Sequence, residues 1–235
     1  VQTCALPISL NFVEPLGEIH LGCGNGAGGN YKDYWKYTIA TDTWTRLDDF
    51  PGSARHHPYF FAVGSDSYIG FGHSSNSPYI EKDWYKYDGV AGTWSSIGDF
   101  ASYEIGSSSS LVSNEARVAG TEFSIVAGGD DASTTCNAGK SRTLGFVLSG
   151  DGDNHGQMPT GEFHAFDPQD KTWRALTPHP STSRWAPGSF VQRGTQRVYL
   201  VGGNKKGNGG NQKDLWTVDL SPLFPASNNN DNDNE

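Results

Sequence analysis

Acidic residues follow a calcium-ligand spacing in one segment, Asp151 to Glu162, which reads DGDNHGQMPTGE. Carboxylates stand at its first, third and twelfth positions, which are Asp151, Asp153 and Glu162, and glycine stands at its sixth, as in an EF-hand loop. Two features argue against calcium: His155 stands among the expected oxygen ligands, and the flanking residues read as strands rather than helices. These three carboxylates are the chain's metal candidates, but we predict no bound metal and no other cofactor.

Sets of residues that could catalyse a reaction are sparse elsewhere in the chain. The seven histidines are scattered, and the adjacent pair His56 and His57 should point to opposite faces of a strand, where they could not share a metal. The three cysteines, Cys4, Cys23 and Cys136, lack the spacing of metal ligands. The sequence therefore favours a non-catalytic role.

Charge and hydropathy exclude two classes of partner. The chain of 235 residues has a formal net charge of -9, whereas proteins that bind nucleic acid cluster lysine and arginine. Its longest apolar runs fall short of the roughly 18 residues that a membrane span needs. We expect neither a nucleic-acid partner nor a membrane span.

A repeated hairpin organises the chain. An acidic residue precedes a tryptophan by 11 positions three times, in the pairs Asp33 and Trp44, Asp83 and Trp94, and Glu162 and Trp173. Both markers shift together, by 50 residues and then by 79, so the third copy carries 29 extra residues upstream of an intact hairpin. A fourth copy begins at Lys213, KDLWTVDL, and ends before a second tryptophan.

A glycine-terminated apolar strand precedes each hairpin, since glycine accepts the backbone geometry of a sharp bend. Its four versions are Glu18–Gly24, Ser67–Gly72, Phe123–Gly129 and Val198–Gly203. Upstream lies a second recurrent link, a proline followed four residues later by Arg55 or Arg184. The third copy, Asp99 to Val112, has neither, and Glu104 or Ile105 takes the place of the arginine.

A period near 50 residues with about four strands per unit resembles the kelch repeat, and the resemblance covers nearly everything from Leu10 to Leu223. It implies an all-β fold, a kelch-type β-propeller of four-stranded antiparallel blades. We expect units at 9–48, 49–98, 99–178 and 179–224, an unassigned tail at 1–8, and a disordered acidic tail at 225–235. Four blades could close a small ring, or the chain could be part of a larger one.

The resemblance also implies a binding site, because the mouth of a kelch ring is lined by the starts of the first strands and by the loops after the glycine strands. These positions hold Arg55, His56, His73, Glu104, Asp130, Asp131, Arg184, Trp185, Asn204 and Lys205. Two arginines facing one cavity would suit carboxylates, acidic peptides or sugar acids. Alternatively, each arginine bonds nearby carbonyl groups and ties the blades together. The long segment Asp130–Thr160 is either functional or a neutral elaboration.

The expected function is a binding module that takes a protein partner or acidic peptide through the mouth of the ring. The alternative is a carbohydrate-binding or carbohydrate-active protein, similar to sialic-acid mutarotases or galactose oxidase, that takes an anionic sugar. The copper site of galactose-oxidase relatives needs a paired Tyr and Cys and two His, and the spacing of these residue types here does not identify such a set. A mutarotase-like reaction would need an arginine and an acid or base such as Glu104 or His73. The sequence motifs of the repeats are similar to those of exported kelch chains, which favours an extracellular or periplasmic location.

Overall fold

The computed structural model describes residues 9–104, 111–113, 115–126, 143–152, 155–192, 194–205 and 209–224. The expectations for the two tails, 1–8 and 225–235, lie outside these residues. Within these ranges the fold is all-β, and the helical segments are short 3-10 turns: η1 (Glu14–Leu16), η2 (Ile39–Thr41) and η5 (Ser221–Leu223). No helix in these ranges is long and apolar enough to cross a membrane.

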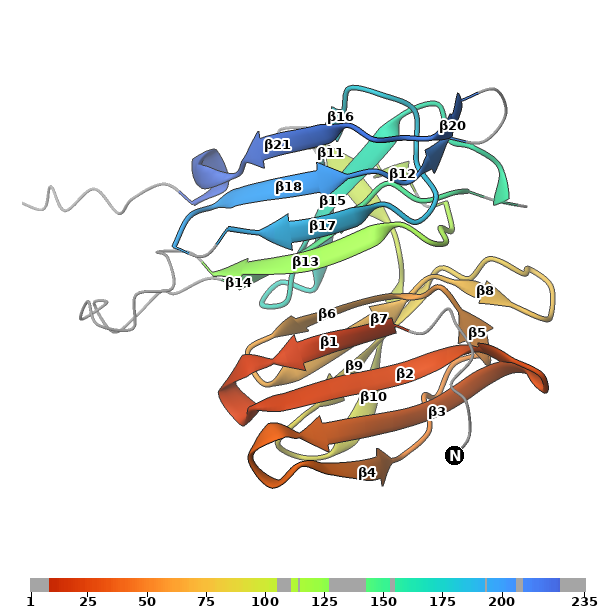
Figure 1. The fold of residues 1–235 in the computed structure, drawn as a ribbon, viewed down its shortest axis with the longest axis vertical. Coiled ribbons are helices and arrows are strands. Elements are labelled where there is room, and N and C mark those ends of the chain that lie inside the picture. Colours follow the sequence, from red (N-terminus) through yellow and green to blue (C-terminus); the bar gives the residue numbers. More distant parts are fainter. Residues whose placement is uncertain are drawn as a thin grey trace, which may run out of the picture.

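Four antiparallel sheets form the blades of a β-propeller, which confirms the predicted fold class (Figure 1). Blade 1 contains β1 (Ser9–Val13), β2 (Glu18–Gly26), β3 (Gly29–Thr38) and β4 (Thr43–Leu47). Blade 2 contains β6 (Tyr59–Val63), β7 (Asp66–Gly70), β9 (Asp83–Asp88) and β10 (Thr93–Asp99). Blade 3 contains β13 (Thr121–Val126), β14 (Thr143–Leu148), β15 (Gly161–Asp167) and β16 (Thr172–His179). Blade 4 contains β17 (Gly188–Val191), β18 (Arg197–Val201) and β21 (Leu215–Asp219).

The remaining strands are short additions to these blades. Blade 3 gains β11 (Ser102–Glu104) and β12 (Leu111–Ser113) at its outer edge. Two small ladders pair β5 (Arg55–His56) with β8 (His73–Ser74), and β19 (Asn204–Lys205) with β20 (Gly210–Asn211). In Figure 1, blades 1 and 2 form the lower half of the molecule, and blades 3 and 4 form the upper half.

The repeated hairpin forms because its turn satisfies its own backbone. Between β9 and β10, the Asp88 carboxylate accepts hydrogen bonds from the backbone N–H groups of Val90 and Ala91, at 3.1 and 2.8 Å. Gly92 then takes a φ of +71°, a left-handed geometry that glycine adopts at little cost. This turn fixes the register in which Trp94 lies opposite Tyr87.

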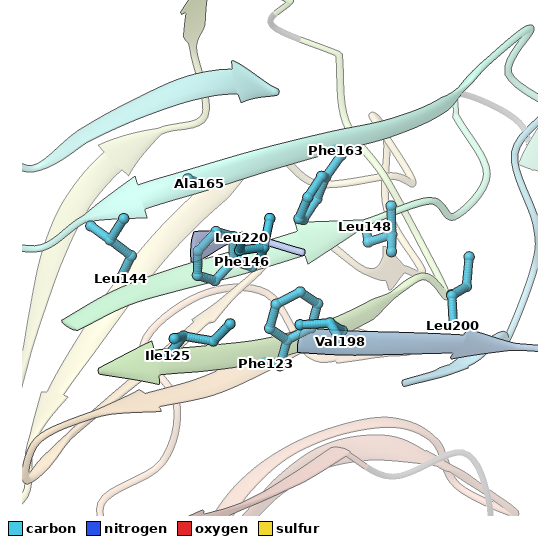
Figure 2. Packing of buried hydrophobic residues seen from close by; sticks show 10 residues of the cluster. All are labelled: Phe123, Ile125, Leu144, Phe146, Leu148, Phe163, Ala165, Val198, Leu200 and Leu220. Atoms are coloured by element: carbon cyan, nitrogen blue, oxygen red, sulfur yellow. The ribbon is translucent and has the colours of Figure 1, made fainter. Parts of the chain in front are cut away.

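The core lies between neighbouring blades rather than within any one of them. The inner strands stand side by side in the order β1, β6, β13 and β17, so that each sheet presents a face to the next. Aromatic side chains dominate between blades 2 and 3, where Phe61, Trp84, Phe166 and Trp173 pack together. The layer between blades 3 and 4 is more aliphatic (Figure 2); it holds Phe123, Ile125, Leu144, Phe146, Leu148, Phe163, Ala165, Val198, Leu200 and Leu220.

The third unit departs from the sequence prediction in its order of strands. Phe123 belongs to β13, the innermost strand of blade 3, and not to the second strand; the second strand is β14. The bend after β14 is Ser149-Gly150, which takes the place predicted for Gly128-Gly129 and has positive φ at both residues, +64° and +100°. The predicted assignment of this glycine strand was therefore wrong.

Arg117, not Glu104, occupies the arginine position of the third unit. Like Arg55 and Arg184, it lies four residues before the first residue of an inner strand. In all three units the second residue after the arginine has a positive φ, at His57 (+52°), Ala119 (+54°) and Ala186 (+49°). Glu104 instead ends β11, which pairs in parallel with β16 at the outer edge of the sheet.

The extra residues of the third unit are consequently divided in two. From the repeat tryptophan to the next arginine there are 11 residues in two cases, Trp44 to Arg55 and Trp173 to Arg184, but 23 from Trp94 to Arg117. From the arginine to the acidic residue there are 28 in unit two and 45 from Arg117 to Glu162. One interruption before the arginine and one after it concealed the match.

Candidate ligand-binding mouth

One end of the propeller gathers the segments that sequence analysis selected. The ladders β5–β8 and β19–β20 both lie toward the right in Figure 1, where the tip of the β2–β3 hairpin also reaches. His56, His73, Trp185, Asn204 and Lys205 all belong to these segments or adjoin them. We call this end the mouth. The predicted residues Asp130 and Asp131 lie outside the described parts of the chain.

The arginines of the inner-strand starts are fully buried and form ion pairs within their own blades. Arg55 donates to both carboxylate oxygens of Asp83, at 2.6 and 3.0 Å, and to the carbonyl of Phe71 at 3.0 Å. Arg184 repeats the arrangement with Asp214, at 2.7 Å for both oxygens, and with the carbonyl of Gly202 at 2.8 Å. Each side chain has 0% exposure.

Blade 3 has the same tie, between Arg117 and Glu162. In each case the arginine at the start of the first strand joins the acidic residue that opens the repeated hairpin. Arg184 and Trp216 donate hydrogen bonds to Asp214, and these hold the pKa of its carboxyl well below the usual range. Burial lowers the pKa of Arg117 to about 10. The geometry thus gives these arginines a structural role and leaves no guanidinium surface at Arg55 or Arg184 for a ligand.

Histidines, in contrast, meet at the surface of the mouth. The nearest ring nitrogens of His56 and His73 are 3.3 Å apart, and those of His73 and His155 are 3.1 Å apart. His57 adds a fourth ring, whose centroid lies 5.1 Å from that of His56. The prediction that His56 and His57 face opposite ways was wrong, because the left-handed backbone at His57 breaks the strand alternation. All four side chains are partly buried.

Asn30, from the β2–β3 hairpin of blade 1, orients the cluster. Its Oδ1 lies 2.7 Å from Nδ1 of His56, while its Nδ2 donates to the carbonyl of His73 at 3.1 Å. The acceptor at Oδ1 favours the His56 tautomer that carries the proton on Nδ1, which leaves the lone pair of Nε2 directed toward His73. One amide side chain therefore connects blade 1 to two histidines of blade 2.

Three histidines of the mouth, His56, His57 and His73, are kept neutral. Burial, together with the neighbouring imidazoles, lowers the pKa of both His56 and His57 to about 4. Burial also lowers the pKa of His73. Each neutral imidazole offers one hydrogen-bond donor and one acceptor, so these three rings present polar but uncharged groups near pH 7.

Blade 4 contributes an aromatic side chain to the same surface. Trp185 packs edge-on against His57, with a centroid distance of 5.2 Å, and its backbone exchanges hydrogen bonds with Asn204 at 2.9 and 2.8 Å. Lys205 is half-buried in β19. All four blades thus supply residues to the mouth: Asn30, the histidines of β5 and β8, His155, and Trp185.

A cavity of about 300 Å³ lies against His57 and extends along the starts of the inner strands. Small residues form much of its wall, including Ala119, Gly120 and Ala186, while Glu122 provides a carboxyl group. Burial raises the pKa of Glu122 to about 8, although the backbone N–H of Phe60 donates a hydrogen bond to it. This acid is therefore largely protonated at neutral pH and can donate a hydrogen bond.

Two of the three carboxylate residues of the predicted calcium segment lie in the described ranges. Glu162 is paired with Arg117, Asp151 is buried beside Val118 through two backbone hydrogen bonds, and Asp153 lies outside the described residues. No group of three or more His, Cys, Asp or Glu side chains in the described ranges is placed to hold a metal ion.

Sequence reasoning missed four members of the mouth and its cavity: Asn30, His57, His155 and Glu122. No local signal identifies them, because Asn30 and His155 come from other blades and His57 was expected to face away. Arg117 could have been found from its sequence, since the spacing of four residues to an apolar strand recurs there.

Comparison with known proteins supports the fold alone. No family model matches the chain, and no curated protein matches it. A solved structure described as "Structure of YjhT" is similar to this chain, with a TM-score of 0.59 at 15% sequence identity. The match covers 87% of this chain and 60% of YjhT, so the chain spans less than two thirds of that protein.

Proposed function

We propose that this propeller is a binding module whose ligand enters the mouth, and that the ligand is uncharged and rich in hydroxyl groups, such as a neutral sugar. The observation that carries the proposal is the cluster of four histidine rings, three of them kept neutral by burial, beside a polar cavity. Catalysis is not part of the proposal.

The charges at the mouth support an uncharged ligand over an anionic one. A sugar acid or acidic peptide would be held best by a guanidinium, but Arg55 and Arg184 are buried against carboxylates of their own blades, which leaves Lys205 to offer a point charge. The net charge of -9 also opposes an acidic partner. Neutral imidazoles, the amide of Asn30 and the protonated Glu122 carboxyl match hydroxyl groups, which both donate and accept hydrogen bonds.

The size of the cavity supports a small ligand. A volume of about 300 Å³ is at the lower end of the range for small-molecule pockets, roughly 300–1,000 Å³. Trp185 offers an apolar ring surface next to these polar groups. The resemblance to kelch propellers that act on sugars is consistent with this ligand class but does not select a particular sugar.

A protein partner is the second candidate, and one observation favours it. Tyr79 lies near His73, with ring centroids 6.4 Å apart, and is 50% exposed. Tyrosine and tryptophan are enriched in protein interfaces, so the rim of the mouth could receive a polypeptide segment in place of a sugar.

A ligand screen by thermal shift tests both candidates on the wild type and on His73→Ala. It should contain neutral monosaccharides and oligosaccharides, sugar acids, and neutral and acidic peptides. We expect a neutral sugar to raise the melting temperature of the wild type but not of His73→Ala. The control, His179→Ala, removes a half-buried histidine outside the mouth and should keep the response.

Two results would contradict the proposal. Stabilisation by sugar acids or acidic peptides alone would show that the ligand class is wrong. A ligand response that is equal in wild type and His73→Ala would place binding elsewhere on the molecule. A response to neutral peptides alone, lost in His73→Ala, would establish the second candidate.

A further inference from the structure

A cavity of about 440 Å³, separate from the one at the mouth, lies between blades 2 and 3. The strands β6, β7, β9 and β10 of blade 2 supply one wall, and the end of β15 with the β15–β16 turn of blade 3 supplies the other. Val63, in the first wall, is the last residue of β6. Because the mouth lies at the starts of the inner strands, this cavity is at the opposite end of the blades.

The equivalent place between blades 1 and 2 holds a satisfied network of polar side chains. Tyr68, which lines the cavity, is equivalent to His20 of blade 1, because each lies opposite a lysine at the same position of the third strand. His20 is fully buried, and its ring nitrogens lie within hydrogen-bond distance of Tyr34, Glu18 and Ser67. The polar atoms of this place are thus satisfied within the protein.

The turn after the third strand accounts for the difference between the two places. In blade 2 this turn contains Gly89, and a Cβ atom added there would lie 2.8 Å from Cδ1 of Leu16 in blade 1. The turn therefore packs directly on the preceding blade. Blade 3 has Pro168 at this position, 79 residues later, the same shift as for the other markers of the repeat. The proline ring cannot approach the preceding blade as closely as glycine does, which leaves the cavity open.

Tyr68 presents a hydroxyl group without a protein partner to this cavity. The residue is 4% exposed, and its hydroxyl forms no hydrogen bond within the described residues. Its oxygen is not fully enclosed, and since the residue lines the cavity, the hydroxyl is accessible from there. Burial raises the pKa of the phenol, which therefore stays protonated and can donate a hydrogen bond. Such a nearly buried hydroxyl is uncommon, and a ligand in the cavity would satisfy it.

Lys171 supplies a positive charge on the other wall. It is exposed, and no residue of the described ranges forms an ion pair with it. Lys86, in contrast, is paired with Asp66 at 2.9 Å and with Asp88 at 3.7 Å. The φ of Lys171 is +55°, in the left-handed region where blade 2 has Gly92. Lysine adopts this geometry at a greater cost than glycine, so the backbone does not explain why a lysine stands here.

We infer that this cavity binds a small organic anion that carries one carboxylate group on an apolar body. The ammonium of Lys171 and the hydroxyl of Tyr68 hold the carboxylate, because hydrogen bonds to a charged group are stronger than neutral ones. Val63, Ile97 and Phe166 form the apolar part of the wall, against which the body of the ligand packs.

The charges favour this class of ligand over two others. Asp66 is already paired with Lys86, which leaves the charge of Lys171 unbalanced in the wall, so a cation is disfavoured. The net charge of -9 disfavours a polyanion, whereas a single carboxylate matches the single unpaired ammonium of the wall. The inference does not depend on the ligand proposed for the mouth, because it uses other residues and another cavity.

Titration with phenylacetate, followed by ¹H–¹⁵N NMR spectra, tests the site. This probe combines a carboxylate with an apolar ring. We expect saturable shifts of the amide signals of Ile97, Gln169 and Lys171, which line the cavity. Phenylacetamide, the uncharged isostere of the probe, should bind at least tenfold more weakly, because it lacks the charge that Lys171 recognises.

Two variants separate binding from stability. Lys171→Gly removes the ammonium and introduces the residue type of Gly92; binding should weaken at least tenfold, while the melting temperature stays equal or rises. Tyr68→Phe removes only the hydroxyl and should weaken binding about tenfold without loss of stability, since no hydrogen bond within the described residues is broken. The control, Lys82→Ala, removes an exposed lysine that does not line the cavity and should retain binding.

Four outcomes would overturn the inference: no saturable shifts, shifts centred on the mouth, equal binding of phenylacetate and phenylacetamide, or binding that survives Lys171→Gly. Binding of inorganic phosphate in place of phenylacetate would show that the class of ligand is wrong. A loss of stability in Tyr68→Phe would contradict the assignment of its hydroxyl as a ligand contact.

Discussion

Two neighbouring sets of residues at the mouth have opposite environments, although each arginine directly precedes a mouth residue in the chain. Arg55 and Arg184 are buried and form ion pairs with Asp83 and Asp214. His56 and Trp185, each one position later, belong to the surface of the mouth. Residue type alone does not distinguish a ligand contact from a structural tie. Burial and the partners of each group do.

The difference has an energetic reason. A guanidinium that is withdrawn from water must be paired and hydrogen-bonded, which the acidic residue and the nearby carbonyl groups provide. A buried imidazole instead loses its proton and becomes neutral, since its ordinary pKa already lies close to neutrality. The arginines therefore stay charged and fixed, whereas His56, His57 and His73 stay neutral.

Removal of a buried arginine should have the largest effect on stability. Arg55→Ala leaves the Asp83 carboxylate and the Phe71 carbonyl without their donor and removes the guanidinium that stacks on Phe50 at 4.8 Å. We expect the free energy of unfolding to fall by about 3 kcal/mol, measured by urea denaturation.

The matched control is Arg46→Ala, which breaks an exposed pair with Asp49. The loss there should be below about 1 kcal/mol, because water screens exposed ion pairs. Equal losses for the two variants would show that Arg55 is not a structural tie and would return it to the candidate ligand contacts.

Acid should produce an intermediate effect that depends on the histidines of the mouth. The pKa of His56 and of His57 is about 4 in the folded chain, against about 6.5 when unfolded. Between these values the unfolded chain binds more protons, so stability is retained above about pH 6.5 and falls as the pH falls toward 4.

Urea denaturation at pH 7 and pH 5 measures this effect. We expect a loss on the order of 1 kcal/mol per histidine, after allowance for their partial exposure. His57→Gln should lessen the pH dependence. An unchanged dependence in that variant would show that His57 titrates normally in the folded chain and that other groups cause the loss.

Asn30→Ala should have the smallest effect. The change removes hydrogen bonds to His56 and His73 at the rim of the mouth, and a net loss of about 1 kcal/mol is typical for such bonds. Because Asn30 sets the proton position on His56, the ¹⁵N shifts of that ring should also change. A stability loss as large as that of Arg55→Ala would instead make Asn30 a main connection between blades 1 and 2.

The fold could be predicted because its signals are local and repeated. Each acidic residue, glycine bend and tryptophan recurs at a nearly constant position within its blade, so Asp83, Gly72 and Trp94 could be matched to their equivalents in the other repeats. Blade 3 shows the limit of this approach. Two interruptions hid Arg117, and the prediction took β13 for the second strand because a glycine pair, Gly128-Gly129, follows Val126 and Ala127 and resembles the usual bend.

The sequence by itself determined the repeated blade, its three complete hairpins and the incomplete fourth. The recurring acidic residue of each hairpin could also be identified from the sequence, but its ion pair with the arginine of the same blade could not. Tertiary structure alone decided which residues share a site: Asn30, His56, His73, His155 and Trp185 come from four blades and meet because the starts of the inner strands and the loops after the second strands gather at one end. Local patterns specify a hairpin, but only the packing of one sheet against the next specifies the space between them.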